Sequence, residues 1–263
     1  MDHMGPFYFN ALRFALGALA LAPLLATAAA RRSLDRRLLP GALLAGTALF
    51  AGASLQQIGL VETTAGKAGF ITGLYVVLVP LAGLLAGRSS GRNTWIGSAL
   101  ALTGLYLLSF DSQALRLAPG DGLVLLGAFF WTAHVLLIDR LASRFHWAPL
   151  ACAQFAVCAL LSLGAALARE TTSAGAVLDA AGPLLYGGLL SVGVAYTLQV
   201  IGQRRAPPGH AAIILSLEAV FAVAGGWMLL DETLDARSLA GCGAMLAGML
   251  VSQRQKKTPR GAD

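Results

Sequence analysis

Nine apolar runs, separated by short polar breaks, occupy most of this chain of 263 residues. A helix needs roughly 20 apolar residues to cross about 30 Å of hydrocarbon, and it satisfies its own backbone hydrogen bonds there. The chain is therefore predicted to be an all-α integral membrane protein. The predicted spans cover residues 7–30, 39–60, 66–87, 94–110, 121–138, 148–168, 182–202, 210–229 and 238–252.

The composition excludes several other classes of protein. Charged residues make up 12% of the chain and the mean hydropathy is +0.70, whereas soluble domains are about 25% charged. The net charge of +6 lies in short clusters between the runs, without the single basic face that nucleic acid would require. Cys152, Cys158 and Cys242 lie inside apolar runs without metal-ligand spacing. The chain has no HExxH or GxSxG motif, so we expect neither an enzyme nor a cofactor.

The basic residues predict the orientation of the chain. If the N-terminus lies outside, the segments 31–37, 88–92, 140–144, 204–205 and 254–260 face the cytoplasm and hold 14 Arg and Lys. The outer segments hold four, which are Lys67, Arg116, Arg169 and Arg237. Because cytoplasmic loops are enriched in Arg and Lys, we expect a multi-pass protein of the inner (cytoplasmic) membrane with a cytoplasmic C-terminus.

An internal repeat joins the two halves. LQQIG at 55–59 recurs as LQVIG at 198–202, an offset of 143 residues. The same offset aligns Gly66 with Gly209, and one residue of slip aligns Gly104 with Gly248. The offset contains five predicted spans, an odd number, so the two copies must lie upside down relative to each other. Inverted repeats are typical of secondary transporters, whose substrate site lies near the midplane. A repeat kept only for packing, as in a scaffold, is the alternative.

Four stretches resemble the EamA-type transporters of the drug/metabolite transporter superfamily. They are PFYFNALRF (6–14), TAGKAGFITGLYVVLVPL (64–81), GDGLVLLGAFFWTAH (120–134) and APPGHAAIILSLEAVFAVAGGWMLLDETL (206–234). The resemblance implies ten helices, arranged as five plus five, and export or exchange of small metabolites, with amino acids frequent among them. PFYFNALRF resembles the start of the second helix of that pattern, so the first helix is missing here. We expect a start codon assigned too late; a genuine four-plus-five variant is the alternative.

The resemblance divides the chain into a first repeat at 1–110, a connecting loop at 111–120, a second repeat at 121–253 and a basic cytoplasmic tail at 254–263. The expected function is a secondary transporter that exports small metabolites, such as amino acids or related compounds, by alternating access. The alternative is a truncated, non-transporting relative or a membrane scaffold. The expected partners are a small-molecule metabolite and the lipid bilayer, and no nucleic acid. Proton coupling and assembly as a homodimer are left open.

Glu218 is the first candidate for the site. It lies eight residues after His210 and eleven before Leu229, about 12 and 16 Å from the ends of its helix. A carboxylate at that depth faces a cavity or a partner, which suggests proton coupling or cation binding; a hydrogen bond between helices is the alternative. Its repeat counterpart is Tyr75, so we expect two polar groups to face each other across the symmetry axis.

Seven further residues complete the candidate set. Trp131 and His134 are three residues apart and share a helix face, so we expect both to line the cavity, although packing alone would explain them. Gln56 and Gln199 are repeat counterparts near opposite membrane faces, which suggests a gate on each side or contacts between helices. Tyr196 is a weaker candidate for substrate or proton binding. Asn10 and Arg13 are weaker candidates too, and for Arg13 snorkelling towards a headgroup region is the alternative.

Overall fold

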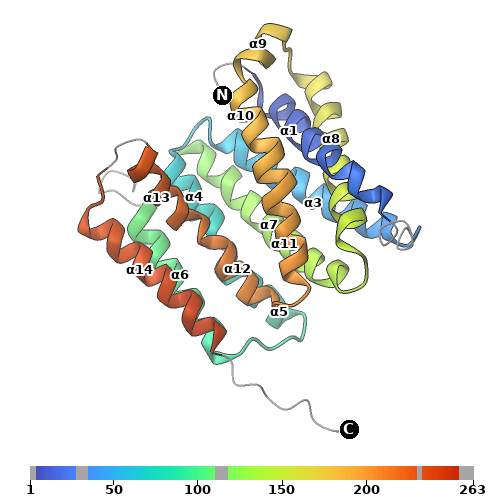
Figure 1. The fold of residues 1–263 in the computed structure, drawn as a ribbon. Coiled ribbons are helices and arrows are strands. Elements are labelled where there is room, and N and C mark those ends of the chain that lie inside the picture. The colour runs from blue at the N-terminus through green and yellow to red at the C-terminus, as the bar shows by residue number, and fades with distance from the viewer. Residues whose placement is uncertain (1–3, 28–34, 110–117, 230–232, 255–263) are drawn as a thin grey trace.

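The structure is a computed structural model that describes residues 4–27, 35–109, 118–229 and 233–254. It is a bundle of helices, with no strand among the residues described (Figure 1). The elements are α1 (Pro6–Leu21), η1 (Ala22–Ala26), α3 (Leu38–Gly59), α4 (Ala65–Gly73), α5 (Tyr75–Leu85), α6 (Arg92–Ser109), α7 (Pro119–Ala142), α8 (Trp147–Arg169), α9 (Ala174–Asp179), α10 (Ala181–Leu185), η2 (Tyr186–Tyr196), α11 (Thr197–Gln203), α12 (Pro208–Ser216), α13 (Glu218–Leu229) and α14 (Ala236–Gln253).

The prediction of an all-α membrane protein is confirmed, because seven helical segments are long and apolar enough to span a membrane. They begin and end within a few residues of the predicted runs: 6–26, 38–59, 65–85, 119–142, 147–169, 181–203 and 208–228. The other two predicted spans form α6 and α14, of 18 residues each. Both are helical, but they are richer in small and polar residues and do not reach the same apolarity.

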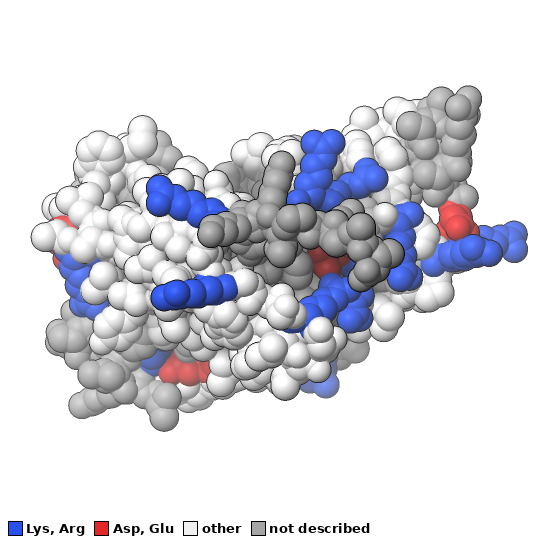
Figure 2. All heavy atoms as spheres, turned by 90° about the horizontal axis from the view of Figure 1, so that it is seen from below, with Lys and Arg blue, Asp and Glu red and all other residues white. Residues whose placement is uncertain are grey.

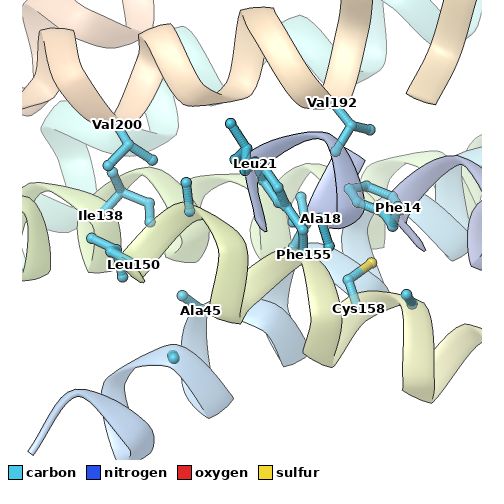
Figure 3. Packing of buried hydrophobic residues seen from close by; sticks show 14 of the residues in the cluster. Phe14, Ala18, Leu21, Ala45, Ile138, Leu150, Phe155, Cys158, Val192 and Val200 are labelled. Atoms are coloured by element: carbon cyan, nitrogen blue, oxygen red, sulfur yellow. The ribbon is translucent and has the colours of Figure 1, made fainter. Parts of the chain in front are cut away.

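The main core lies between α1, α3, α7, α8 and the segment η2–α11. Phe14 of α1 and Phe155 of α8 are fully buried at its centre, with ring centroids 6.3 Å apart (Figure 3). Val192 and Val200 close the core from the side of η2 and α11. The apolar residues thus face neighbouring helices, while large side chains such as Leu44, Leu160 and Phe221 are exposed, as a protein surrounded by lipid requires.

The segment η2 is π-helical over eleven residues. Its wider turns pack against α1 where Gly17 and Gly188 leave room: a Cβ on Gly188 would lie 2.7 Å from the Cβ of Leu16. Long π-helical stretches are rare and are often found at functional sites. Here the stretch ends at Tyr196, one of the predicted site residues.

Helices α6 and α14 pack against each other through reciprocal glycines. A Cβ on Gly97 would lie 2.7 Å from the carbonyl oxygen of Gly248, and a Cβ on Gly104 would lie 2.6 Å from that of Gly241. With an offset of 144, Gly97 corresponds to Gly241 and Gly104 to Gly248. Each contact therefore becomes the other when the two helices are exchanged, which is the arrangement that a two-fold inverted repeat requires. Small residues allow such close approach of helices in a membrane.

Salt bridges fix both ends of α7 to the α4–α5 segment. Near its N-terminus, Asp121 lies 2.7 Å from Nζ of Lys67, and both side chains are buried. The hydroxyl of Thr63 also donates to Asp121, at 2.6 Å. Near its C-terminus, Asp139 lies 2.9 Å from Arg88, in a more exposed pair. Because α7 begins the second predicted repeat, whereas Lys67 and Arg88 belong to the first, these bridges join the two repeats.

Candidate substrate cavity

Two helical segments break at equivalent positions of the predicted repeat. The first breaks at Leu74, between α4 and α5, and the second at Leu217, between α12 and α13. These leucines are 143 residues apart, the offset of the repeat. At each break the amide donates to a carbonyl only three residues back, Leu74 to Ile71 and Leu217 to Ile214. The sequence predicted one continuous helix for each of these runs, because an apolar run does not reveal a local tightening of the backbone.

The residue after each break lies on the wall of one cavity. Tyr75 begins α5, Glu218 begins α13, and both line a hollow of about 240 Å³. The full lining is Arg13, Gln56, Gln57, Leu60, Thr72, Tyr75, Trp131, Val135, Tyr196, Gln199, Leu215 and Glu218. Discontinuous helices in corresponding positions of two halves are typical of substrate sites in secondary transporters.

The carboxylate of Glu218 faces open space. By surface area Glu218 is exposed, although it lies in the middle of its helical run, because it stands between two hollows. The second hollow, of about 530 Å³, is lined by α4, α6, α12 and α13 and extends along Gly73, Gly69 and Gly66. Gly66 and Ser109 lie at the same end of the bundle as Lys67, so this mostly small-residue hollow leads from Glu218 towards that end.

Aromatic rings form one side of the cavity that Tyr75 and Glu218 line. Trp131 of α7 lies 6.0 Å from Tyr196 between ring centroids, and Tyr196 stacks on Phe14 at 6.2 Å. The indole Nε1 of Trp131 is buried and has no hydrogen-bond partner among the described residues. This side of the cavity therefore offers apolar faces and at least one unused donor.

Arg13 lies on the same wall. Its guanidinium lies over the rings of Phe14 and Phe9, with Cζ at 5.0 and 5.5 Å from their centroids. Cation–π contacts of this kind stabilise a cation by about 0.5–2 kcal/mol. Within the described part of the chain Arg13 makes no ion pair, and its Nε is buried without a partner.

The two predicted glutamines both reach the cavity from opposite ends of the bundle. Gln56 belongs to the last turns of α3, and Gln199 belongs to α11. Gln199 donates to Gln203 at 3.0 Å, and Gln203 donates to the carbonyl of Val135 at 3.0 Å. Gln199 thus has a contact between helices through its neighbour, while Gln56 makes no side-chain hydrogen bond within the described residues.

His134 is the one predicted site residue that is absent from the lining. It is buried, and its Nε2 lies 2.9 Å from the amide oxygen of Gln154 on α8. Its ring meets Trp131 edge-on at 6.0 Å. Residues three apart share a helix face, but that face here is split between the cavity, which Trp131 and Val135 line, and the contact with α8.

Thr72 and Gln57 line the cavity but were not among the predicted site residues. Arg13, a weaker candidate from the sequence, lines it as well; it is the one charge within an otherwise apolar first run, and intramembrane charges mark functional sites. Thr72 and Gln57 carry no such signal. The structure forms no group of three or more His, Cys, Asp or Glu that could hold a metal ion, counting only residues it describes.

The chain matches a family model over nearly its whole length. The model is that of the EamA-like transporter family, and it matches residues 1–110 and 118–253. The chain belongs to the EamA-like transporter family. The resemblance to EamA-type members of the drug/metabolite transporter superfamily is therefore confirmed.

Two individual proteins are similar to this chain, one in sequence and one in fold. An uncharacterized transporter of Archaeoglobus fulgidus is 31% identical over 253 residues, which cover 95% of this chain and 78% of that protein. A protein of known crystal structure has the same fold, with a TM-score of 0.81 over 95% of this chain and 89% of that one, at 19% identity. By its family and its named relative, this EamA-like chain is a multi-pass membrane transporter, and the family points away from an enzyme.

Proposed function

We propose that this EamA-like chain exports small metabolites, such as amino acids or related compounds, across the cytoplasmic membrane by alternating access. One observation carries the proposal: Tyr75 and Glu218 begin the second halves of two broken helices and line a common cavity. Broken helices related by an inverted repeat let one site face either side of the membrane in turn. The division at residues 1–110 and 121–253 into two such repeats is part of the proposal.

Glu218 is the proposed coupling group. Its carboxylate faces open space between two hollows, and no described residue donates a hydrogen bond to it. A carboxylate in that position can bind either a proton or a cationic substrate, but not both at once. Binding of the substrate therefore releases the proton, and binding of a proton releases the substrate. Tyr75 and Tyr196 share the cavity with it and supply hydroxyls to the same site.

The test compares the spent medium of cells that express the wild type, Glu218→Gln, Glu62→Gln or an empty vector, by untargeted mass spectrometry. The Glu62→Gln change makes the same chemical substitution on an exposed residue outside the cavity. A small set of metabolites should accumulate with the wild type and Glu62→Gln and not with the other two. Identical media from all four strains would contradict export by this chain.

A second candidate function is a non-transporting relative or scaffold, and one feature of the structure favours it. In the first half, α7 packs closely against α3 at Gly52, Leu55 and Gly59. A Cβ on Gly59 would lie 2.8 Å from the carbonyl oxygen of Gly120. The counterparts on η2 and α11 at the offset of 143 are Ala195, Leu198 and Gly202. All three are exposed, and a Cβ on Gly202 would meet nothing within 4 Å.

This exposed stripe borders Tyr196 and Gln199, which line the cavity. A cavity with one side uncovered would not close fully during a transport cycle. The chain would then carry no substrate, and a role as a membrane scaffold would be left. A second copy of the chain could cover the stripe as a homodimer. The spent-medium comparison separates these outcomes, because an unclosed cavity supports no export.

A further inference from the structure

The cavity contains two opposite charges that do not pair with each other. Arg13 and Glu218 both line it, yet the ion pairs among the described residues are Lys67–Asp121 and Arg88–Asp139. An unpaired charge in a low-dielectric site is costly. Each of these groups is therefore stabilised most by a ligand that brings the opposite charge.

Two buried donors of the cavity residues favour an anion. Nε of Arg13 and Nε1 of Trp131 have no partner among the described residues. Neither a guanidinium nor an indole can accept a hydrogen bond. The guanidinium of Arg13 lies over the rings of Phe9 and Phe14, which offer no hydrogen-bond acceptor to its Nε. A carboxylate, which accepts several hydrogen bonds in a plane, matches such a guanidinium better than any neutral group.

The part of the cavity around Glu218 has the opposite preference. The ionised carboxylate only accepts hydrogen bonds, and the hydroxyl of Thr72, buried without a partner among the described residues, also lines the cavity. An ammonium group has three donors and no acceptor. The aromatic rings of Tyr75, Trp131 and Tyr196 then leave room for an apolar body that joins the two charges.

We infer that Arg13 and Glu218 bind the two charged groups of one zwitterionic substrate, an amino acid with an apolar or aromatic side chain. Arg13 binds its carboxylate and Glu218 binds its ammonium group. The inference rests on the proposed transport function and deepens it. It assigns a specificity role to Arg13 and gives Glu218 a direct contact with the cargo. A simple amine or a simple acid satisfies only one of the two charges and leaves the other unpaired.

The experiment measures counterflow uptake into liposomes that contain the purified full chain. Three probes of the same aromatic body are compared: phenylalanine, phenethylamine, which lacks the carboxylate, and 3-phenylpropionate, which lacks the amine. The variants are Arg13→Gln and Glu218→Gln. Arg237→Gln is the control, because Arg237 lies at the surface beside Tyr106 and outside the cavity.

The wild type and Arg237→Gln should favour phenylalanine over both analogues by about 10- to 100-fold, the range expected for one lost hydrogen-bonded charge. Arg13→Gln should lower phenylalanine flux to the level of the amine and leave amine flux unchanged. Glu218→Gln should lower the phenylalanine flux to the level of the 3-phenylpropionate flux and leave the 3-phenylpropionate flux unchanged. These changes of ratio differ from a general loss of folding, which lowers all three fluxes together.

Two results would overturn the inference. One is a wild type that carries either analogue as well as phenylalanine, or carries none of the probes; this needs no variant and so stands even if Arg13→Gln fails to fold. The other is an Arg13→Gln variant with an unchanged ratio of phenylalanine to amine. In either case the spent-medium comparison still decides whether the chain exports anything, because it depends on no assumption about the cargo.

Discussion

Glu170 stabilises the start of α1 from the far end of α8. Its two carboxylate oxygens accept hydrogen bonds from the amides of Phe7 and Tyr8, at 3.0 and 2.9 Å. The first amides of a helix have no partner within the helix, and a negative charge there also favours the helix dipole. This contact links the first span to the end of the sixth predicted span, far away in the sequence.

Glu170→Ala should therefore lower the stability of the chain by about 1–2 kcal/mol, and Glu170→Gln by less, because the amide oxygen still accepts one bond. The thermal unfolding midpoint in detergent should fall in the order wild type, Glu170→Gln, Glu170→Ala. Glu62→Ala, a change of an exposed loop residue, is the control and should leave the midpoint in place. Equal midpoints for all four proteins would remove the capping role.

The sequence predicted some site residues and missed others for identifiable reasons. Glu218 and Tyr75 could be paired because the repeat offset aligns them, and the structure brings them to one cavity. His134 could not be separated from Trp131, because helix periodicity gives a face but not the neighbour that the face meets. Arg13 stood out as the one charge of its run, but the neighbours that its side chain meets depend on how α1 turns relative to η2 and α7, which no pattern in that run specifies.

At the scale of elements, the close packing of α6 and α14 depends on glycine backbones. A Cβ at Gly104 would lie 2.6 Å from the carbonyl oxygen of Gly241 and would also clash with Met245. Gly104→Ala should therefore force the helices apart and cost about 1–3 kcal/mol, the usual cost of overpacking. Gly243→Ala is the matched control, because a Cβ there would meet nothing within 4 Å.

The measurement is the thermal unfolding midpoint of both variants in the same detergent. Gly104→Ala should unfold at a lower temperature than the wild type, while Gly243→Ala should match it or gain slightly from better helix propensity. Equal effects of the two substitutions would contradict a close α6–α14 contact. Gly97→Ala, a substitution in the reciprocal contact with Gly248, should behave like Gly104→Ala.

The two salt bridges of α7 should differ in strength because they differ in burial. Asp121→Asn removes the carboxylate that lies 2.7 Å from the buried ammonium of Lys67, and breaking a buried pair costs about 3–5 kcal/mol. Asp139→Asn breaks a pair in which the Arg88 side chain is 51% exposed, and exposed pairs contribute about 0–1 kcal/mol. Unfolding midpoints should therefore drop clearly for Asp121→Asn and barely for Asp139→Asn, and the reverse order would refute this ranking.

At the scale of elements, the sequence predicted the helices but not their internal breaks. Among the residues described, apolar length and charged breaks located the seven segments that are long and apolar enough to span a membrane, and also the helices α6 and α14, because transfer into lipid depends on the length and composition of a run. The breaks at Leu74 and Leu217 depend on one residue of tighter hydrogen bonding, which apolar composition does not encode. The repeat offset could have marked the two positions as equivalent, but only the structure reveals that both are interrupted.

The whole molecule is asymmetric in charge. One end of the bundle carries Arg36, Arg37, Arg88, Arg92, Arg140, Arg144, Arg204, Arg205 and Arg254, and the other end carries Lys67, Arg169 and Arg237. Contacts place the first set at one end: Arg88 pairs with Asp139, and the side chain of Asn93 donates to the carbonyl of Arg254. Figure 2 shows Lys and Arg spread over this face, which is the lower end in Figure 1.

This distribution predicts that the arginine-rich end faces the cytoplasm. The test uses a chain whose Cys152, Cys158 and Cys242 are replaced by Ala, since all three thiols are free. Single cysteines are then introduced as Glu62→Cys, at the Lys67 end, and Ser89→Cys, beside Arg88; both positions are exposed. A membrane-impermeant maleimide should label Glu62→Cys in intact cells and Ser89→Cys only after the membrane is permeabilised.

The result also bears on the direction of transport. The second hollow leads from Glu218 past Gly69 and Gly66 to the Lys67 end, so labelling of Glu62→Cys in intact cells would make that hollow an outward path, as an exporter requires. Labelling of Ser89→Cys in intact cells would invert the molecule, and the hollow would then lead from Glu218 to the cytoplasm. A cysteine-free chain, treated in parallel, measures background labelling. Because both cysteines belong to the same first half, opposite labelling of the two is the pattern that a spanning α4–α5 segment between them demands.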